Sequence, residues 1–135
     1  MAYFTFTDAS NETFVVRLTD PALVRHARGL LDGSVATDFH IGGTITKAPV
    51  EYNIGWSYQI APRNVFFFEV SAEVGDSTMR YIEDLLGEVG GALLPGRVWT
   101  GWSSELVAEL RVRPGGEGIH LLLGTDAAGL MAGLE

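Results

Sequence analysis

The strongest hydrophobic pattern in the chain is the alternation of apolar and polar residues from Val65 to Val74. A period of two residues is typical of a half-buried β-strand, whose apolar side chains share one face. In VFFFEVSAEV these side chains are Phe66, Phe68, Val70, Ala72 and Val74. The same period predicts four more strands, which run from Phe4 to Phe6, from Phe14 to Leu18, from Phe39 to Ile45 and from Trp56 to Ile60.

Two other segments have the spacing of amphipathic helices. In the first, the expected N-cap is Asp20 or Thr19. Pro21 suits the first helical position and Gly33 suits the end of the helix. The second helix is expected to begin after Asp76 or Ser77, to end at Gly90 and Gly91, and to bury Met79, Ile82, Leu85, Leu86 and Val89.

These elements predict one α+β domain in residues 1–113. Ser104 to Val112 is the expected sixth strand, although a short helix remains an alternative there. Turn-forming residues from Asp8 to Glu12 predict an antiparallel hairpin. Because one face of each strand is apolar, we expect two layers: a mainly antiparallel sheet of five to six strands with two helices on one face. The expected order is β-β-α-β-β-β-α-β, followed by a glycine-rich tail in residues 114–135 or a last strand from His120 to Leu123.

Composition narrows the class of partner. The 135 residues suit one core, and no apolar run approaches the roughly 20 residues that a membrane-spanning helix needs. Nine basic and 17 acidic side chains give a net charge of -8, which repels the phosphates of nucleic acids. The chain has no cysteine, and therefore no disulfide or thiolate metal site. We expect no membrane partner, no nucleic acid, no metal and no cofactor.

Few residues point to catalysis. His40 lies on the polar face of its predicted strand without carboxylates at ligand spacing, whereas a metal site needs three or four ligands. Glu69 and Glu73 are about 13 Å apart by strand rise, too far for a carboxylate pair unless neighbouring strands contribute. A small hydrolase that uses His40 with Glu69 or Glu73 is kept as an alternative hypothesis.

All three tryptophans lie in or beside two segments without either period, Lys47 to Tyr58 and Leu93 to Ser104. Large amphipathic side chains and Arg on loops are enriched in binding surfaces. We therefore predict a non-enzymatic module that binds a protein partner through Tyr52, Asn53, Trp56, Arg97, Trp99 and Trp102. A preorganised proline-containing loop makes protease inhibition one form of this hypothesis. Two alternatives remain: tryptophans that fold inward to close the sheet, and a structural domain that forms homodimers.

Several motifs carry a family resemblance. TDPALVRHAR, YNIGWSY, FFEVSAEV and DSTMRYIEDLLGEVGGALLPG resemble the N-terminal domain of the slime-mould calmodulin-binding protein family, a domain also found in bacterial proteins. The resemblance covers Phe4 to Leu110 and implies a fold family without known catalytic residues. Calmodulin binds basic amphipathic helices, whereas the second predicted helix carries Glu83, Asp84 and Glu88 against Arg80. Calmodulin is therefore not an expected partner.

The C-terminal stretch GGEGIHLLL is similar to the nonapeptide of repeats-in-toxin proteins. That repeat needs Asp at its sixth position because Ca²⁺ takes oxygen ligands, and here the position is His120. We expect no working calcium site. Such proteins are exported through a C-terminal signal, and the chain as given begins without a classical signal peptide. This resemblance favours an extracellular location for a bacterial protein, with a cytoplasmic location left open.

Overall fold

The computed structural model describes residues 1–70, 77–113 and 120–123. Its regular elements are β1 (Ala2–Thr7), β2 (Thr13–Leu18), α1 (Pro21–Asp32), β3 (His40–Thr46), β4 (Gln59–Ile60), β5 (Phe66–Phe68), α2 (Met79–Asp84), β6 (Val98–Thr100), β7 (Glu105–Arg113) and β8 (His120–Leu123). Single turns of 3₁₀ helix lie at Pro62–Asn64, Leu86–Glu88 and Pro95–Arg97. No helix within the described ranges has the length and hydropathy needed to cross a membrane.

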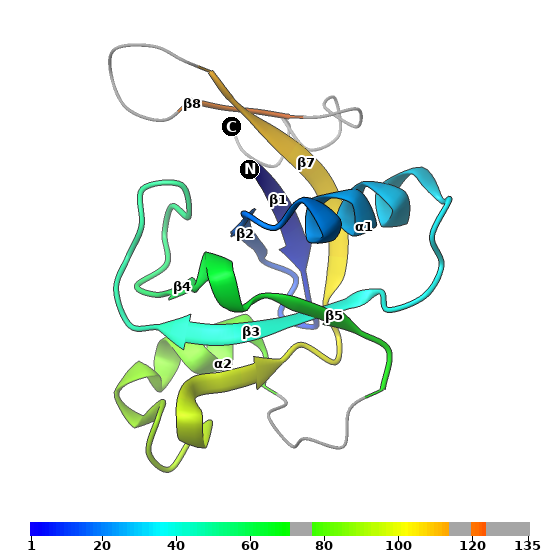
Figure 1. Cartoon of the computed structure of the whole chain (residues 1–135). Helices are drawn as coiled ribbons and strands as arrows, with labels where there is room; N and C mark the ends of the chain where they lie inside the picture. Colours follow the sequence, from blue (N-terminus) through cyan, green and yellow to red (C-terminus); the bar gives the residue numbers. More distant parts are fainter. Residues whose placement is uncertain (71–76, 114–119, 124–135) are drawn as a thin grey trace.

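The strands form two antiparallel sheets (Figure 1). In the first, the order is β2-β1-β7-β8, and β1 and β2 form the predicted hairpin. In the second, β3 pairs with β4, β5 and β6. The α+β class and the antiparallel pairing are confirmed, whereas the prediction of a single sheet is wrong. Its physical reason is that β1 takes β7 as its second neighbour, a pairing between strands about 100 residues apart that no local pattern encodes.

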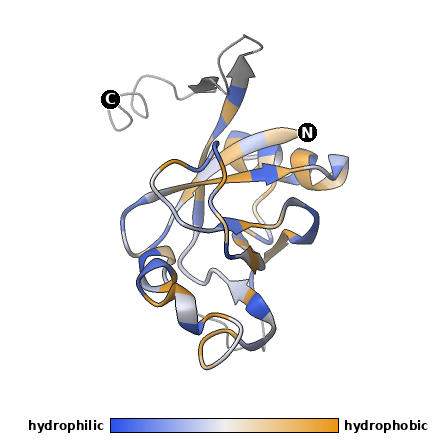
Figure 2. Cartoon of the chain, turned by 90° about the vertical axis from the view of Figure 1, so that its left-hand side faces the viewer, coloured by the Kyte–Doolittle hydropathy of each residue, from blue (hydrophilic) through white to orange (hydrophobic). Residues whose placement is uncertain are grey.

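The two helices lie on opposite sides of the molecule, so the prediction that both cover one face is also wrong (Figure 2). Helix α1 has the predicted ends: the Asp20 side chain accepts a hydrogen bond from the backbone N–H of Ala22, and Gly33 adopts φ +85°. It packs on β7 and β2 of the first sheet. Helix α2 is shorter than predicted, and Thr78 caps it instead of Asp76 or Ser77.

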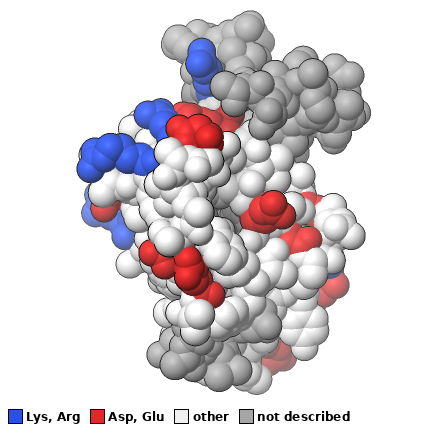
Figure 3. Space-filling view, turned by 90° about the vertical axis from the view of Figure 1, so that its right-hand side faces the viewer, with Lys and Arg blue, Asp and Glu red and all other residues white. Residues whose placement is uncertain are grey.

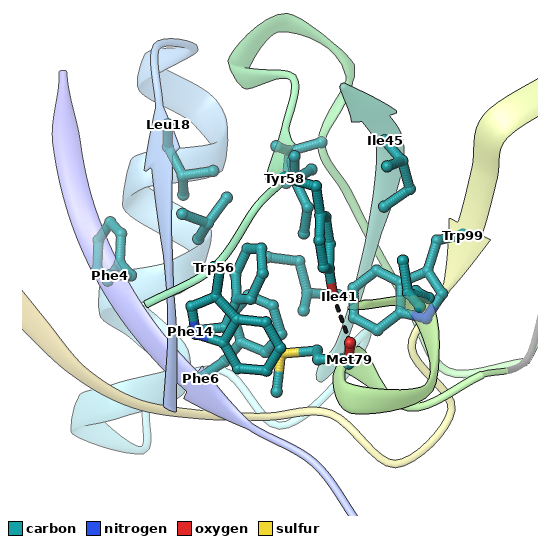
Figure 4. Packing of buried hydrophobic residues seen from close by; sticks show 14 of the residues in the cluster. Phe4, Phe6, Phe14, Leu18, Ile41, Ile45, Trp56, Tyr58, Met79 and Trp99 are labelled. Carbon is teal, nitrogen blue, oxygen red and sulfur yellow. Dashed lines mark hydrogen bonds between the residues drawn. The ribbon is translucent and has the colours of Figure 1, made fainter. Parts of the chain in front are cut away.

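A single hydrophobic core fills the space between the two sheets (Figure 4). The first sheet contributes Phe4, Phe6, Phe14 and Leu18, and the second contributes Ile41, Ile45 and Trp99. Met79 and Ile82 of α2 complete the core from the side. Because the inner faces of both sheets are apolar, the core is built from strands far apart in the sequence, and its aromatic rings stack across the interface between the sheets.

The phenylalanine-rich segment is extended, but the strand predicted from Val65 to Val74 is too long. Strand β5 has three residues, and its last pair joins Phe68 to His40, the first residue of β3. Beyond that pair β3 has no residue to offer, and Val70 is 83% exposed. The rest of the predicted strand, from residue 71, lies outside the described residues. The predicted sixth strand is confirmed as β7, and β8 pairs with it.

Candidate functional site

The six predicted binding residues do not form one surface. Tyr52, Asn53 and Trp56 belong to the loop between β3 and β4, at the left of Figure 1, whereas Arg97, Trp99 and Trp102 come from the segment that runs through β6 to β7. Their predicted exposure is wrong for four of them, because the exposed fractions are 3% for Tyr52, 2% for Asn53, 6% for Trp56 and 1% for Trp99. Arg97 is exposed and Trp102 is half-buried.

Trp99 is a core residue for a clear physical reason. Its indole stacks on Phe6 of the opposite sheet, with ring centroids 5.8 Å apart. Its indole nitrogen donates a hydrogen bond of 2.7 Å to the backbone carbonyl of Ser77, so burial leaves no donor unpaired. The alternative in which the tryptophans fold inward therefore describes Trp99 correctly. Trp102 instead packs edge-on against Phe68, at 5.3 Å between centroids.

The β3–β4 loop covers the free edge of β2. The Asn53 side-chain oxygen accepts a hydrogen bond of 2.9 Å from the backbone N–H of Val15, and its amide nitrogen donates to the carbonyl of Tyr58 at 3.3 Å. The Trp56 indole donates to the carbonyl of Thr13 at 2.9 Å. Both side chains occupy positions that a neighbouring strand would fill, and an edge strand needs such a cover to avoid unwanted pairing. They are anchors of the loop.

Aromatic packing fixes the same loop from two sides. Tyr52 packs edge-on against Tyr3 on the outer face of the first sheet, at 5.1 Å between centroids. Trp56 packs against Phe14 at 5.1 Å, and the Arg80 guanidinium lies over its ring at 4.8 Å. Arg80 is itself held by a bidentate ion pair with Glu12. Cation–π and ion-pair contacts therefore clamp the exposed side of the indole.

The large hydrophobic residue that this loop exposes is Ile54, which is 83% exposed. It occupies the second position of a β-turn closed by a hydrogen bond of 3.4 Å from the N–H of Trp56 to the carbonyl of Asn53. Gly55 follows with φ +91°, the left-handed conformation that a type II turn requires at its third position. Sequence reasoning missed Ile54, although the Asn-Ile-Gly-Trp turn pattern was there to identify the tip.

Burial also sets the protonation of two tyrosines beside this loop. It raises the pKa of the Tyr58 hydroxyl well above its ordinary value, and that hydroxyl donates a hydrogen bond of 2.8 Å to the carbonyl of Met79 (Figure 4). Burial likewise raises the pKa of Tyr52. Both phenols therefore stay neutral at physiological pH and act as packing groups.

The surroundings of His40 bear on the hydrolase hypothesis. Its Nδ1 lies 2.9 Å from the backbone carbonyl of Ser104, and the Glu69 carboxylate accepts a hydrogen bond from the backbone N–H of Asp38. Among the described residues, no hydrogen bond joins His40 to Glu69, and Glu73 lies outside them. No three His, Asp or Glu side chains in the described part of the chain lie close enough to hold a metal ion.

With this geometry in place, comparison identifies the domain. The model of a domain family described as the BP-74 N-terminal domain matches residues 1–113. The chain belongs to this family. The match confirms the resemblance to the N-terminal domain of the slime-mould calmodulin-binding protein family, and the matched residues include every described element except β8. Comparisons with curated proteins and with solved structures find no match.

Within the matched family domain lie the anchored β3–β4 loop, His40 and all six predicted binding residues. The stretch that is similar to repeats-in-toxin proteins lies beyond the matched residues. Apart from the backbone of β8, it also lies outside the part that the structure describes. The absence of a calcium site there stays a prediction.

Proposed function

We propose that this family domain is a non-enzymatic binding module that presents the Ile54 turn to a protein partner. The observation that carries the proposal is the contrast within one loop: Tyr52, Asn53 and Trp56 are buried anchors, and Ile54 between them is 83% exposed. The predicted contact residues thus change role, because they hold the loop and the partner meets its tip.

Preorganisation supports this role. A loop that is ordered before binding loses little conformational entropy when the partner arrives, so more of the contact energy appears as affinity. Here the turn is closed by a backbone hydrogen bond, and each side of it is tied to β2 through Asn53 and Trp56. An aliphatic side chain held out at such a tip suits insertion into an apolar pocket.

In its more specific form, the partner is an endopeptidase whose specificity pocket accepts an aliphatic side chain, and the module is a protease inhibitor. Export from a bacterial cell, favoured by the C-terminal resemblance, would bring the module to such enzymes. A rigid loop with one protruding aliphatic residue has the shape that a small hydrophobic specificity pocket receives. Homodimerisation through an exposed sheet face remains a separate structural hypothesis.

The test is inhibition of a panel of purified serine and cysteine endopeptidases, including elastase-type enzymes, followed by measurement of inhibition constants for variants. Ile54→Asp should abolish inhibition of any enzyme that the wild-type domain inhibits, because a carboxylate cannot enter an apolar pocket without losing its hydration. Val70→Asp is the matched control, since Val70 is equally exposed at a different place. It should leave inhibition unchanged.

If no enzyme of the panel is inhibited, the inhibitor form is wrong. The binding module itself is then tested by affinity capture with the wild-type domain and both variants, identification of captured proteins, and measurement of their dissociation constants. A partner that binds wild type and Val70→Asp but loses affinity for Ile54→Asp supports the proposal. Equal binding of all three proteins contradicts it.

A further inference from the structure

A second candidate site lies where the end of α1 meets the turn between β6 and β7. A pocket of about 430 Å³ opens there, which is within the usual size range of small-molecule sites. Its apolar wall comes from α1, the loop after it and β7, and consists of Leu30, Val35, Ala36, Phe39 and Leu106. The pocket shares no residue with the β3–β4 loop.

The polar groups of the pocket begin with His40, which is half-buried. A backbone carbonyl can only accept a hydrogen bond, so the contact of 2.9 Å to the Ser104 carbonyl places the proton of the neutral ring on Nδ1. Nε2 then carries a lone pair and acts as an acceptor. The Ser104 hydroxyl is already used, because it accepts from the N–H of Ile41 and donates to the carbonyl of Gly101.

Glu105 adds a negative charge to the pocket. Its side chain is exposed, and among the described residues no Lys or Arg pairs with it. Ser103 completes the polar set with a hydroxyl that accepts a hydrogen bond from the N–H of Ala9. None of the lining residues is basic. The pocket therefore offers one carboxylate and one imidazole acceptor beside an apolar wall.

The surrounding surface has the same polarity. Figure 3 views the molecule from the right-hand side of Figure 1, where the loop after α1 lies, and shows carboxylates spread over this face while Lys and Arg gather at its upper left. Together with the net charge of -8, this distribution attracts cations to the face.

From this arrangement we propose that the pocket binds a cationic amine with an apolar body. The ammonium group pairs with Glu105 and donates to Nε2 of His40, and the apolar body packs against Leu30 and Leu106. Both a free organic amine and the lysine side chain of a peptide carry this chemistry. The site is independent of the Ile54 turn and goes beyond the proposed binding function.

The experiment is a titration of ¹⁵N-labelled protein, followed by two-dimensional NMR, with phenethylamine and with N-acetyl-lysine methylamide. Saturable shifts are expected at the amides of Phe39, Glu105 and Leu106, with a dissociation constant of about 1 mM for such small probes. Tighter binding of the lysine derivative would identify a peptide as the source, and tighter binding of phenethylamine a free amine. 2-Phenylethanol, the neutral analogue, should bind more weakly than phenethylamine.

Two variants and two controls sharpen the result. Glu105→Gln should weaken amine binding about fivefold, as expected for one partly exposed ion pair, and Glu51→Gln removes an exposed charge outside the pocket without effect. Ala36→Phe should abolish binding by filling the pocket, while thermal unfolding verifies that each variant is folded. Ile54→Asp should bind amines as wild type does, which separates this site from the proposed function. Absence of saturable shifts, equal affinity for the alcohol, or unchanged affinity in Glu105→Gln would overturn the proposal.

Discussion

The side-chain amide of Asn53 ties the β3–β4 loop to β2, and Asn53→Ala tests how much that tie contributes. The substitution leaves the N–H of Val15 and the carbonyl of Tyr58 without their partners. Both hydrogen bonds are buried, so water cannot replace the amide without cost. The loop should then loosen from the edge of β2 while the two sheets keep their core.

The magnitude follows from the two contacts. A buried group that loses its hydrogen-bond partner costs about 1–3 kcal/mol. The contact to Val15 is 2.9 Å long and the contact to Tyr58 is 3.3 Å, so the second belongs near the lower end of that range. Their sum is about 3 kcal/mol in free energy of unfolding, or roughly 10 °C in Tm for a domain of this size.

Urea unfolding monitored by circular dichroism measures the free energy, and hydrogen exchange measures the protection of the Val15 amide. Asn53→Ala should lower both. Asn53→Asp keeps an acceptor for Val15 but sets a carboxylate against the Tyr58 carbonyl; because burial raises the pKa of such a carboxyl, this variant should regain stability as pH falls. A loss below about 0.5 kcal/mol in Asn53→Ala, with the Val15 amide still protected, would refute the reasoning.

Three further predictions concern stability. Trp99→Ala removes a side chain that is 1% exposed and should lower the free energy of unfolding by roughly 3–5 kcal/mol in urea titrations, whereas a surface residue would change it little. Gly55→Ala forces a Cβ into φ +91° and should cost about 1 kcal/mol in the same assay; no loss would contradict the type II turn. The Arg80 guanidinium lowers the pKa of Glu12, so the ion pair stabilises the fold above the ordinary carboxyl pKa and this contribution disappears as pH falls through the lowered value. The stability difference between wild type and Glu12→Gln should therefore vanish in acid, and a difference that persists there would exclude this mechanism.

Local elements of the fold were predictable because their signals are local. Helix α1 carries its N-cap Asp20, its Pro21 and its terminal Gly33 within one segment, and the structure has all three in those roles. The β1–β2 hairpin and β7 follow from two-residue periods that match their buried positions. Helix α2 was less well predicted, since several residues before it are able to cap and Thr78 is the one that does.

The candidate site was harder to predict because its decisive contacts are distant in sequence. Whether a tryptophan in a loop points outward depends on what faces it, and Trp99 meets Phe6 from the other end of the domain. Asn53 is buried because the free edge of β2 needs hydrogen-bond partners, which the sequence around Asn53 does not reveal. Ile54 is the exception, since turn chemistry at Gly55 indicates its position directly.

The proposed function depends most on the rigidity of the Ile54 turn in the free protein. Measurement of ¹⁵N relaxation in the isolated domain tests this rigidity directly. The backbone order parameters of Ile54 and Gly55 should lie at about 0.85, the value expected of the neighbouring strands. Values below about 0.6 at these two residues, with rigid strands around them, would contradict it.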